Sequence, residues 1–315
     1  MRNWVLAIGI LLLMSLGASA EQSKSAIKNG EFTAKLNGLT LWYKVSGDGP
    51  VCLMPSPAWG PSSTTYFRTL KRLEKTFTIV YLDSRGTGRS EEASTDKEYT
   101  WNHLVADLDA LRVHLKQRKV WLMGHSEGGV QVLHYACSHP DRVNGLVLLD
   151  AYAADDDQWR ADVDGRVQRR ENEPWFKEAV AAWDSDPKTD EEKNHVFHKM
   201  LPFYWSDPAG IQKYKDDYAA DKLKLVSSRG RQASGRMQFD LTAKLKKVTA
   251  PALIVVGDDD FICSPFAARR LQLCLPNSKL LLIEKAGHYP WMEQPEEFFT
   301  QVPAFLEALG LPKKQ

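Results

Sequence analysis

The chain has 315 residues, of which 43% are hydrophobic, and its 41 lysine and arginine residues nearly balance its 40 aspartate and glutamate residues. The formal net charge of +1 excludes a general electrostatic attraction to nucleic acid or to anionic membranes, so we expect no nucleic-acid partner. The length suits one large α/β core that carries an insertion.

The first twenty residues are typical of a secretory signal peptide. Arg2 precedes an apolar run at residues 4–16, and Ala18-Ser19-Ala20 offers a small-residue cleavage site before Glu21. The alternative is a membrane anchor, but the apolar run is shorter than the roughly 20 residues of a spanning helix. We therefore expect cleavage after Ala20, a periplasmic or secreted mature protein, and no stable membrane anchor.

The mature chain is expected to open with a β-hairpin and then to alternate strands with helices. Asn37-Gly38, a strong hairpin signal, separates predicted strands at residues 31–36 and 39–45. Further strands are expected at residues 51–54, 77–82, 120–123, 143–149, 252–256 and 280–283, and helices at residues 63–73, 101–115, 127–138, 265–274 and 296–309. Apolar strands in this rhythm predict a mostly parallel sheet with helices on both faces.

The alternation stops between residues 154 and 236, where the chain is polar but rich in aromatic residues. A disordered segment would be poor in aromatics, whereas this one contains Trp159, Trp175, Phe176, Trp183, Phe203, Tyr204 and Trp205. We therefore expect a helical cap at residues 154–236, inserted between two parts of the core at residues 21–153 and 237–315. Whether Tyr204 and Trp205 line a pocket or only join the cap to the core stays open.

Residues 120–129 predict a buried strand that runs into a sharp turn and then a helix. The turn, Gly124-His125-Ser126-Glu127-Gly128, has the Gly-x-Ser-x-Gly pattern of a serine nucleophile. Gly124 and Gly128 lack the Cβ atoms that would collide where the chain doubles back. Because five residues can match by chance in a loop, the pattern needs partners elsewhere in the chain.

Two later loops offer those partners. A serine nucleophile needs a histidine that takes its proton and a carboxylate that orients the histidine. Gly257-Asp258-Asp259-Asp260 follows one predicted strand, and Gly287-His288 follows the next. The chain order serine, aspartate, histidine is the order typical of this strand-turn-helix nucleophile. We therefore expect His288 to be the general base for Ser126.

Together with residues 82–90 (Leu-Asp-Ser-Arg-Gly-Thr-Gly-Arg-Ser) and 286–290 (Ala-Gly-His-Tyr-Pro), these motifs resemble the α/β-hydrolase family over the whole mature chain apart from the cap. The resemblance implies an α/β-hydrolase fold with a mostly parallel, eight-stranded sheet. By motif position it also implies Asp260, rather than Asp258 or Asp259, as the catalytic acid.

The oxyanion that forms during acyl transfer needs N–H donors preset for it. One is expected at Glu127, directly after the nucleophile. The other should come from the loop after the strand at residues 51–54, where many family members have His-Gly-x-Pro and this chain has Met54-Pro55-Ser56-Pro57. Because proline has no N–H, Ser56 is the donor expected in this stretch, and it matches the x position of the family.

The four cysteines, Cys52, Cys137, Cys263 and Cys274, are predicted to enter an oxidising compartment, and three complete disulfide pairings can be drawn. None is required, because Cys52 and Cys137 fall in a predicted buried strand and a predicted helix, where a free thiol acts as a small apolar filler. No Cys-x-x-Cys or His-x-x-x-His spacing suggests a metal site. We expect neither a metal nor a cofactor.

The sequence therefore predicts a secreted serine hydrolase that cleaves a small ester, lactone or amide through an acyl-enzyme intermediate. The expected partner is a small-molecule or short-peptide substrate. A remote alternative is a non-catalytic binding module on the same fold.

A second alternative is a prolyl aminopeptidase (proline iminopeptidase), because residues 260–265 and 85–90 resemble that family, in which a cysteine often lies three residues after the acid. Those enzymes usually have Gly-Gly-Ser-Trp-Gly-Gly at the nucleophile and His-Gly-Gly-Pro-Gly at the oxyanion loop, and both motifs differ here. They bind the substrate amine through cap carboxylates, for which the candidates are Glu171, Glu173, Asp216, Asp217 and Asp221.

Overall fold

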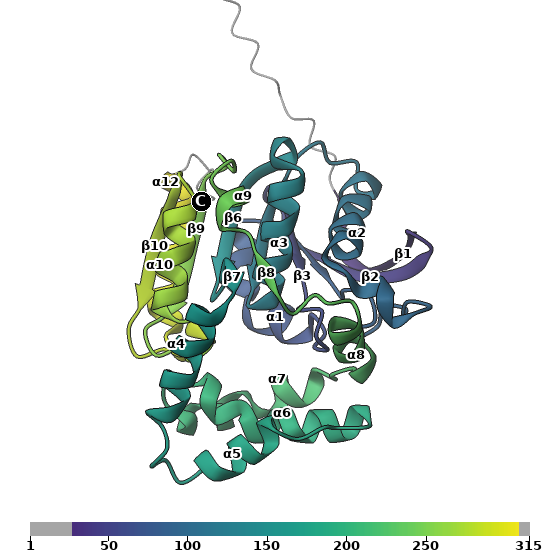
Figure 1. Cartoon of the computed structure of the whole chain (residues 1–315). Helices are drawn as coiled ribbons and strands as arrows, with labels where there is room; N and C mark the ends of the chain where they lie inside the picture. The colour runs from purple at the N-terminus through teal and green to yellow at the C-terminus, as the bar shows by residue number, and fades with distance from the viewer. Residues whose placement is uncertain (1–26, 309–315) are drawn as a thin grey trace, which may run out of the picture.

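The computed structural model describes residues 27–308, and an eight-stranded sheet forms its centre (Figure 1). In order across the sheet, the strands are β1 (Gly30–Leu36), β2 (Leu39–Ser46), β4 (Thr78–Leu82), β3 (Val51–Pro55), β5 (Val120–His125), β6 (Val143–Leu149), β9 (Ala252–Gly257) and β10 (Ser278–Ile283). β2 is antiparallel to both β1 and β4, and all other neighbours are parallel. The predicted eight-stranded, mostly parallel sheet is confirmed.

The predicted hairpin between β1 and β2 is present and closes at Asn37-Gly38. Asn37 has φ 50° and Gly38 has φ 85°, the left-handed values that a two-residue type I′ turn requires. Leu36 pairs with Leu39 across the turn. The turn therefore sets the register of the first two strands.

The strand side chains alternate between two hydrophobic cores, one on each face of the sheet. Leu53 and Val80 belong to the core under α2, α3, α9 and α10, whereas Met54 and Tyr81 belong to the core under α1, α11 and α12. The helices outside the insertion are α1 (Thr64–Thr69), α2 (Trp101–His114), α3 (Glu127–Ser138), α9 (Thr242–Leu245), α10 (Pro265–Cys274), α11 (Pro290–Glu293) and α12 (Pro295–Ala308). The 3₁₀ helices η1 (Lys71–Lys75), η2 (Asp96–Tyr99) and η3 (Pro140–Arg142) also lie outside it, whereas η4 (Pro208–Tyr214) lies within it.

One predicted helix, at residues 63–73, differs from the structure. It consists of α1 and the separate 3₁₀ helix η1, because the backbone leaves the α-helical region at Leu70 (φ −94°, ψ 11°). Leu70, at the break, and Leu73 of η1 are both fully buried.

Residues 154–236, which we call the insert, are mostly helical and connect to the core through a pair of short strands. β7 (Ala154–Asp155) pairs antiparallel with β8 (Phe239–Asp240), which follows the insert. The insert helices are α4 (Asp157–Gln168), α5 (Phe176–Trp183), α6 (Asp190–Tyr204), α7 (Lys215–Ala220) and α8 (Leu225–Ala233). Figure 1 shows α5, α6 and α7 grouped at one end of the sheet, below α1 and α3.

Within residues 27–308, no helix is both long and apolar enough to cross a membrane. The predicted signal peptide at residues 1–20 lies outside the described residues.

Candidate active site

Ser126 lies in a strained turn between β5 and α3. Its backbone has φ 54° and ψ −127°, a combination that residues other than glycine rarely adopt. The turn is held on both sides, because the Ser126 N–H donates to the Leu149 carbonyl (3.0 Å) and the Ser126 carbonyl accepts from the N–H groups of Gly129 (2.9 Å) and Val130 (3.2 Å). The Ser126 side chain lines a cavity of about 530 Å³ between the core and the insert.

The two glycines of the motif are required by close backbone contacts. A Cβ atom on Gly124 would lie 2.4 Å from the Gly128 carbonyl oxygen and 2.7 Å from the Gly129 Cα. A Cβ atom on Gly128 would lie 2.9 Å from the Pro55 carbonyl oxygen. The helix α3 can therefore start against β3 and β5 only with small residues at these positions.

His288 and Asp260, from the loops after β10 and β9, are joined by a hydrogen bond. Nδ1 of His288 lies 2.7 Å from Oδ2 of Asp260, and both side chains are buried. The other oxygen, Oδ1, accepts from the N–H groups of Ile262 (2.9 Å) and Cys263 (3.0 Å). Burial by itself would raise the pKa of Asp260, but His288 and these hydrogen bonds lower it below its ordinary value. Asp260 is therefore an ionised carboxylate that orients the imidazole.

The two neighbouring aspartates have other partners. Asp259 forms an ion pair with Arg170 of the segment after α4 (2.6 Å), and the Asp258 carboxylate accepts from the Ala286 N–H (3.2 Å). Of the three aspartates in this turn, Asp260 is the one that contacts His288.

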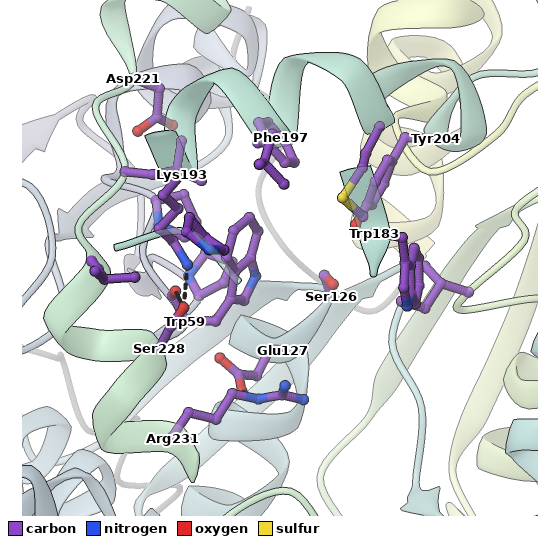
Figure 2. A pocket seen from close by; sticks show the side chains of 18 of the residues that line it. Trp59, Ser126, Glu127, Trp183, Lys193, Phe197, Tyr204, Asp221, Ser228 and Arg231 are labelled. Atoms are coloured by element: carbon purple, nitrogen blue, oxygen red, sulfur yellow. Dashed lines mark hydrogen bonds and ion pairs between the residues drawn. The ribbon is translucent and has the colours of Figure 1, made fainter. Parts of the chain in front are cut away.

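Ser126 and His288 line the same cavity, which lies between Trp59 and Lys193 on one side and Trp183 and Tyr204 on the other (Figure 2). No hydrogen bond joins the Ser126 and His288 side chains among residues 27–308. The Ser126 side chain instead contacts the Cys263 thiol. In unliganded hydrolases the bond between nucleophile and base is often long and forms fully only with substrate.

A second buried carboxyl group, that of Asp150, directly follows β6 and interacts electrostatically with Asp260. Its Oδ1 accepts from the Gly257 N–H (3.0 Å), and its Oδ2 has no hydrogen-bond partner among the described residues. Burial and the nearby Asp260 raise the pKa of Asp150 well above its ordinary value. Asp150 is therefore a neutral carboxylic acid next to an ionised one. Its position at a strand end is the one signal by which sequence reasoning could have found it.

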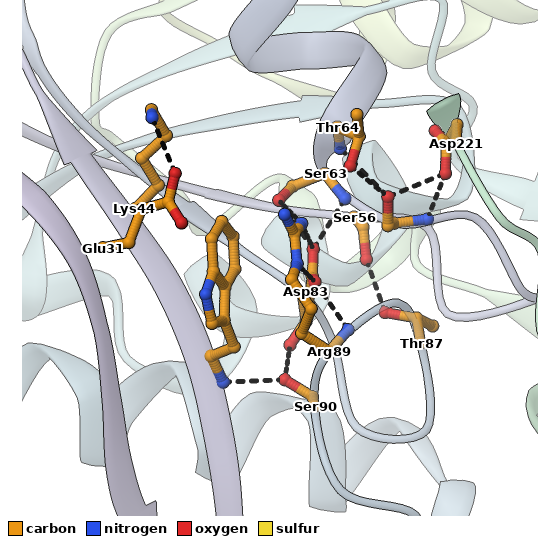
Figure 3. Close-up of polar contacts among 12 residues, drawn as sticks. Glu31, Lys44, Ser56, Ser63, Thr64, Asp83, Thr87, Arg89, Ser90 and Asp221 are labelled. Atoms are coloured by element: carbon orange, nitrogen blue, oxygen red, sulfur yellow. Dashed lines mark hydrogen bonds and ion pairs between the residues drawn. The ribbon is translucent and has the colours of Figure 1, made fainter. Parts of the chain in front are cut away.

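The sequence-based assignment of Ser56 as an oxyanion donor is wrong. The Ser56 N–H already donates to the Leu82 carbonyl (2.8 Å), because the β3 ladder with β4 continues one residue past Pro55. Ser56 is fully buried, and its hydroxyl points to Thr87 (2.9 Å; Figure 3). Ser56 does carry the N–H between Pro55 and Pro57, but its partner lies on another strand and cannot be read from the local sequence.

The motif at residues 82–90 forms hydrogen bonds with the start of α1. The Asp83 carboxylate accepts from the N–H and the hydroxyl of Ser63 (2.7 and 2.6 Å) and from the Nε of Arg89 (2.7 Å), as Figure 3 shows. This motif therefore holds the segment beside the cavity in place, and its residues do not line the cavity.

Glu127, the first residue of α3, lines the cavity next to Ser126. Within the described part of the chain, its N–H has no protein partner. Its buried side chain forms an ion pair with Arg231 of α8 (2.7 Å) and lies 3.4 Å from Arg236. Figure 2 shows the Arg231 side chain reaching from α8 towards Glu127. The backbone of Glu127 is thus available to a ligand, whereas its carboxylate has protein partners.

All four cysteines are free thiols. The ligand atoms of Cys263, Asp260 and His288 lie within 4.8 Å of one another, which is close enough to hold a metal ion. Burial and the nearby carboxylates raise the pKa of Cys263 well above its ordinary value, so the thiol stays protonated. Because metals bind the thiolate, we interpret this group as a hydrogen-bonded Asp–His pair beside a neutral thiol.

The aromatic residues of the insert have different positions. Tyr204 and Trp183 line the cavity, whereas Trp205 is buried and donates its indole N–H to the Tyr218 hydroxyl (3.0 Å). Of the five candidate amine-binding carboxylates, Asp221 lines the cavity. Its oxygens accept from the N–H and hydroxyl of Ser62 and from the Thr65 hydroxyl (2.7–2.9 Å).

Residues 57–295 match the family model of the alpha/beta hydrolase fold. The chain therefore belongs to the alpha/beta hydrolase fold family, and it is a hydrolase enzyme. It is similar to proline iminopeptidase PfmaB of Pestalotiopsis fici, with 26% identity over 284 residues that cover 87% of this chain and 98% of that protein. It is also similar to a proline iminopeptidase of Lactobacillus crispatus, with 27% identity over 292 residues that cover 86% of this chain and 95% of that protein. A solved alpha/beta fold family hydrolase from Bacillus anthracis has a TM-score of 0.73 at 19% identity, with 88% of this chain and 99% of that chain covered.

Proposed function

We propose that this protein is a serine hydrolase with Ser126 as nucleophile, His288 as general base and Asp260 as the acid that orients His288. The observation that carries the proposal is the buried 2.7 Å hydrogen bond between Asp260 and His288, beside the cavity on which the strained Ser126 turn opens. This arrangement of strained serine, imidazole and carboxylate suits acyl transfer.

In the proposed mechanism, Ser126 Oγ attacks the substrate carbonyl while Nε2 of His288 accepts the hydroxyl proton. The carboxylate of Asp260 stabilises the imidazolium, and His288 then donates the proton to the leaving group. A water molecule, activated by His288, releases the acyl group from Ser126. Each step uses side chains of the chain itself.

The oxyanion would accept a hydrogen bond from the Glu127 N–H, which has no protein partner in the described chain. A second donor would come from beyond Pro57, where Ala58 and Trp59 carry the next two N–H groups. Their carbonyl oxygens are already held, by the Arg236 guanidinium (2.9 Å) and the Ser228 hydroxyl (2.7 Å). The Ala58 carbonyl shares its peptide plane with the Trp59 N–H, so the bond to Arg236 would hold that N–H in one orientation.

The substrate class that we propose is a small ester, lactone or amide whose apolar part lies under the insert. The volume of about 530 Å³ and the lining side chains Trp59, Trp183, Phe197 and Tyr204 support this class. A periplasmic or secreted location is part of the same proposal and is supported by residues 1–20 alone.

A prolyl aminopeptidase is the second candidate, and the similar proline iminopeptidases favour it. Of the three lining carboxylates, Glu127 pairs with Arg231 and Asp186 with Lys188, whereas Asp221 accepts from Ser62 and Thr65 and has no cationic partner among the described residues. Asp221 is therefore the carboxylate that would bind the substrate amine of an aminopeptidase. The cationic side chains of Lys193 and Arg231 in the same lining disfavour a positively charged substrate. Comparison of proline β-naphthylamide with p-nitrophenyl esters distinguishes the two candidates, since an aminopeptidase cleaves the naphthylamide faster.

The proposal is tested with Ser126→Ala, and Ser185→Ala, at another serine of the cavity lining, is the matched control. We expect Ser126→Ala to lower kcat by at least about 10³-fold and to abolish labelling by a fluorophosphonate, while Ser185→Ala keeps both. Wild-type turnover in Ser126→Ala would exclude the mechanism. A folded wild-type protein that reacts with neither esters, amides nor fluorophosphonate would point to the non-catalytic binding module.

A further inference from the structure

We propose that the substrate of this site carries a carboxylate group, which Lys193 of α6 and Arg231 of α8 bind. This inference rests on the proposed function, because it specifies the substrate class of the same cavity. It depends on the arrangement of charge on one side of the cavity, where Figure 2 shows Lys193, Ser228 and Arg231 together.

Positive charge exceeds negative charge on this side. Glu127 is the one carboxylate in ion-pair contact with Arg231 (2.7 Å) and Arg236 (3.4 Å) among the described residues. Lys193 interacts electrostatically with Arg231, with Glu127 and with Asp190, which itself lies 3.5 Å from Lys224. Within ion-pair distance, this group of three cations therefore has one buried carboxylate, that of Glu127. Because buried charges are stable only when they are paired, the cluster lacks an anion.

Lys193 is the clearest case of a cation without a carboxylate partner. Its side chain is almost fully buried, its ammonium group donates a hydrogen bond to the Ser228 hydroxyl, and it lies 5.3 Å from the centre of the Trp59 ring. Among the described residues, no carboxylate lies within ion-pair distance of Lys193. Burial and Arg231 lower the pKa of Lys193 to about 8. An ammonium group with one hydroxyl partner keeps two N–H donors for a ligand.

Arg231 offers the complementary donor group. Its Nε donates to Glu127 Oε1 (2.7 Å), and its terminal nitrogens have no partner in the described chain. The side chain is 26% exposed and lines the cavity, so these nitrogens are accessible to a ligand. A guanidinium group binds the two oxygens of a carboxylate with parallel hydrogen bonds.

The other two cations of the lining have partners or face solvent. Lys188 forms an ion pair with Asp186, and Arg229 is 61% exposed and lies 3.9 Å from Asp96. Neither is buried against the aromatic part of the cavity. Lys193 and Arg231 are therefore the pair that would select an anionic substrate.

The experiment compares two series of p-nitrophenyl esters with the same leaving group. One series is the mono-p-nitrophenyl esters of succinic, glutaric, adipic and suberic acid, and the other has the terminal carboxylate of each acid converted to its methyl ester. We expect wild-type kcat/KM to favour the carboxylate form by at least about tenfold at the chain length that spans from Ser126 to the Lys193 side of the cavity. We expect Lys193→Met, which keeps the length of the side chain, to remove this preference, and Lys188→Met to keep it.

The carboxylate can also belong to the leaving group, so 4-carboxyphenyl butyrate and its methyl ester form a second arm. The inference is supported if either arm shows a preference for the anionic ester and Lys193→Met removes that preference. An enzyme that hydrolyses the esters, is labelled at Ser126 and shows no preference in either arm overturns it, while the proposed function stands.

A binding measurement separates the inference from catalysis. Ser126→Ala protein is titrated calorimetrically with glutarate and with inorganic phosphate, with and without Lys193→Met. Glutarate binding that weakens at least about tenfold in the double variant supports the carboxylate site even if no ester is turned over. Phosphate that binds as tightly as glutarate, or glutarate binding that does not depend on Lys193, overturns it. Melting curves of each variant confirm that the protein is folded.

Discussion

The hydroxyl of Tyr66 lies 2.9 Å from Nδ1 of His125, the residue directly before the proposed nucleophile. The other ring nitrogen, Nε2, lies 2.8 Å from the carbonyl oxygen of His288. A carbonyl oxygen can only accept, so Nε2 carries the proton and Nδ1 accepts from the Tyr66 hydroxyl. Burial and the nearby His288 lower the pKa of His125 well below its ordinary value, which keeps the ring neutral. Tyr66 and His125 thus fix the backbone of His288.

Tyr66→Phe tests this chain of hydrogen bonds. The change leaves Nδ1 of His125 buried without a donor, which costs about 1–3 kcal/mol of unfolding free energy. We expect denaturant unfolding to show this loss and ester hydrolysis to fall because the His288 backbone is held less firmly. Tyr214→Phe is the control, since its hydroxyl donates to the Met292 carbonyl at a partly buried position. Equal stability of Tyr66→Phe and wild type would contradict the assignment.

Asp260→Asn should lower kcat by roughly 10³- to 10⁴-fold with little change in KM. An amide cannot stabilise the imidazolium, and it can select the wrong tautomer of His288. Asp259→Asn is the matched control one position earlier, where the carboxylate pairs with Arg170 and is 48% exposed. Steady-state kinetics on a p-nitrophenyl ester measure both. The assignment would fail if Asp259→Asn were the more damaging change.

Gly124→Ala should lower the unfolding free energy by at least about 2–3 kcal/mol, because the new methyl group meets backbone atoms that cannot move aside. Gly165→Ala gives the opposite result. Gly165 lies on the exposed side of α4, and no atom lies within 4 Å of the position that a Cβ atom would take there, so alanine should stabilise the protein by about 0.5–1 kcal/mol. Thermal or urea unfolding measures whether each variant is less or more stable than the wild type. A neutral Gly124→Ala would contradict the tight turn.

The preference for a carboxylate-bearing ester should decrease as the pH rises through about 8, the pKa to which burial and Arg231 lower Lys193. The ammonium group is charged below this pKa and neutral above it, so the anion loses one of its two cations at high pH. The groups that act on Lys193 are Arg231, Glu127 and Asp190. The ratio of kcat/KM for the acid and its methyl ester cancels the titration of His288. In Lys193→Met the ratio should stay flat across this range.

Much of the core was predictable because its signals are local. Asn37-Gly38 closes the first hairpin through its own backbone angles, and the alternation of apolar strands with helices gives the parallel sheet. The turn at Ser126 was likewise predictable, since Gly124 is required by contacts with Gly128 and Gly129 of the same turn. Asp260 and His288 follow consecutive parallel strands, whose carboxyl ends lie on one edge of the sheet.

The tertiary structure decided which polar atoms pair across long stretches of chain. The Ser56 N–H is bonded to Leu82, Tyr66 reaches His125, and Arg231 reaches Glu127. The sequence by itself determined the sheet, the serine turn and the order of the candidate triad, because periodicity and turn chemistry depend on near neighbours. The oxyanion loop and the charge of the cavity wall depend on burial and hydrogen-bond partners, which exist only once the insert is folded against the core.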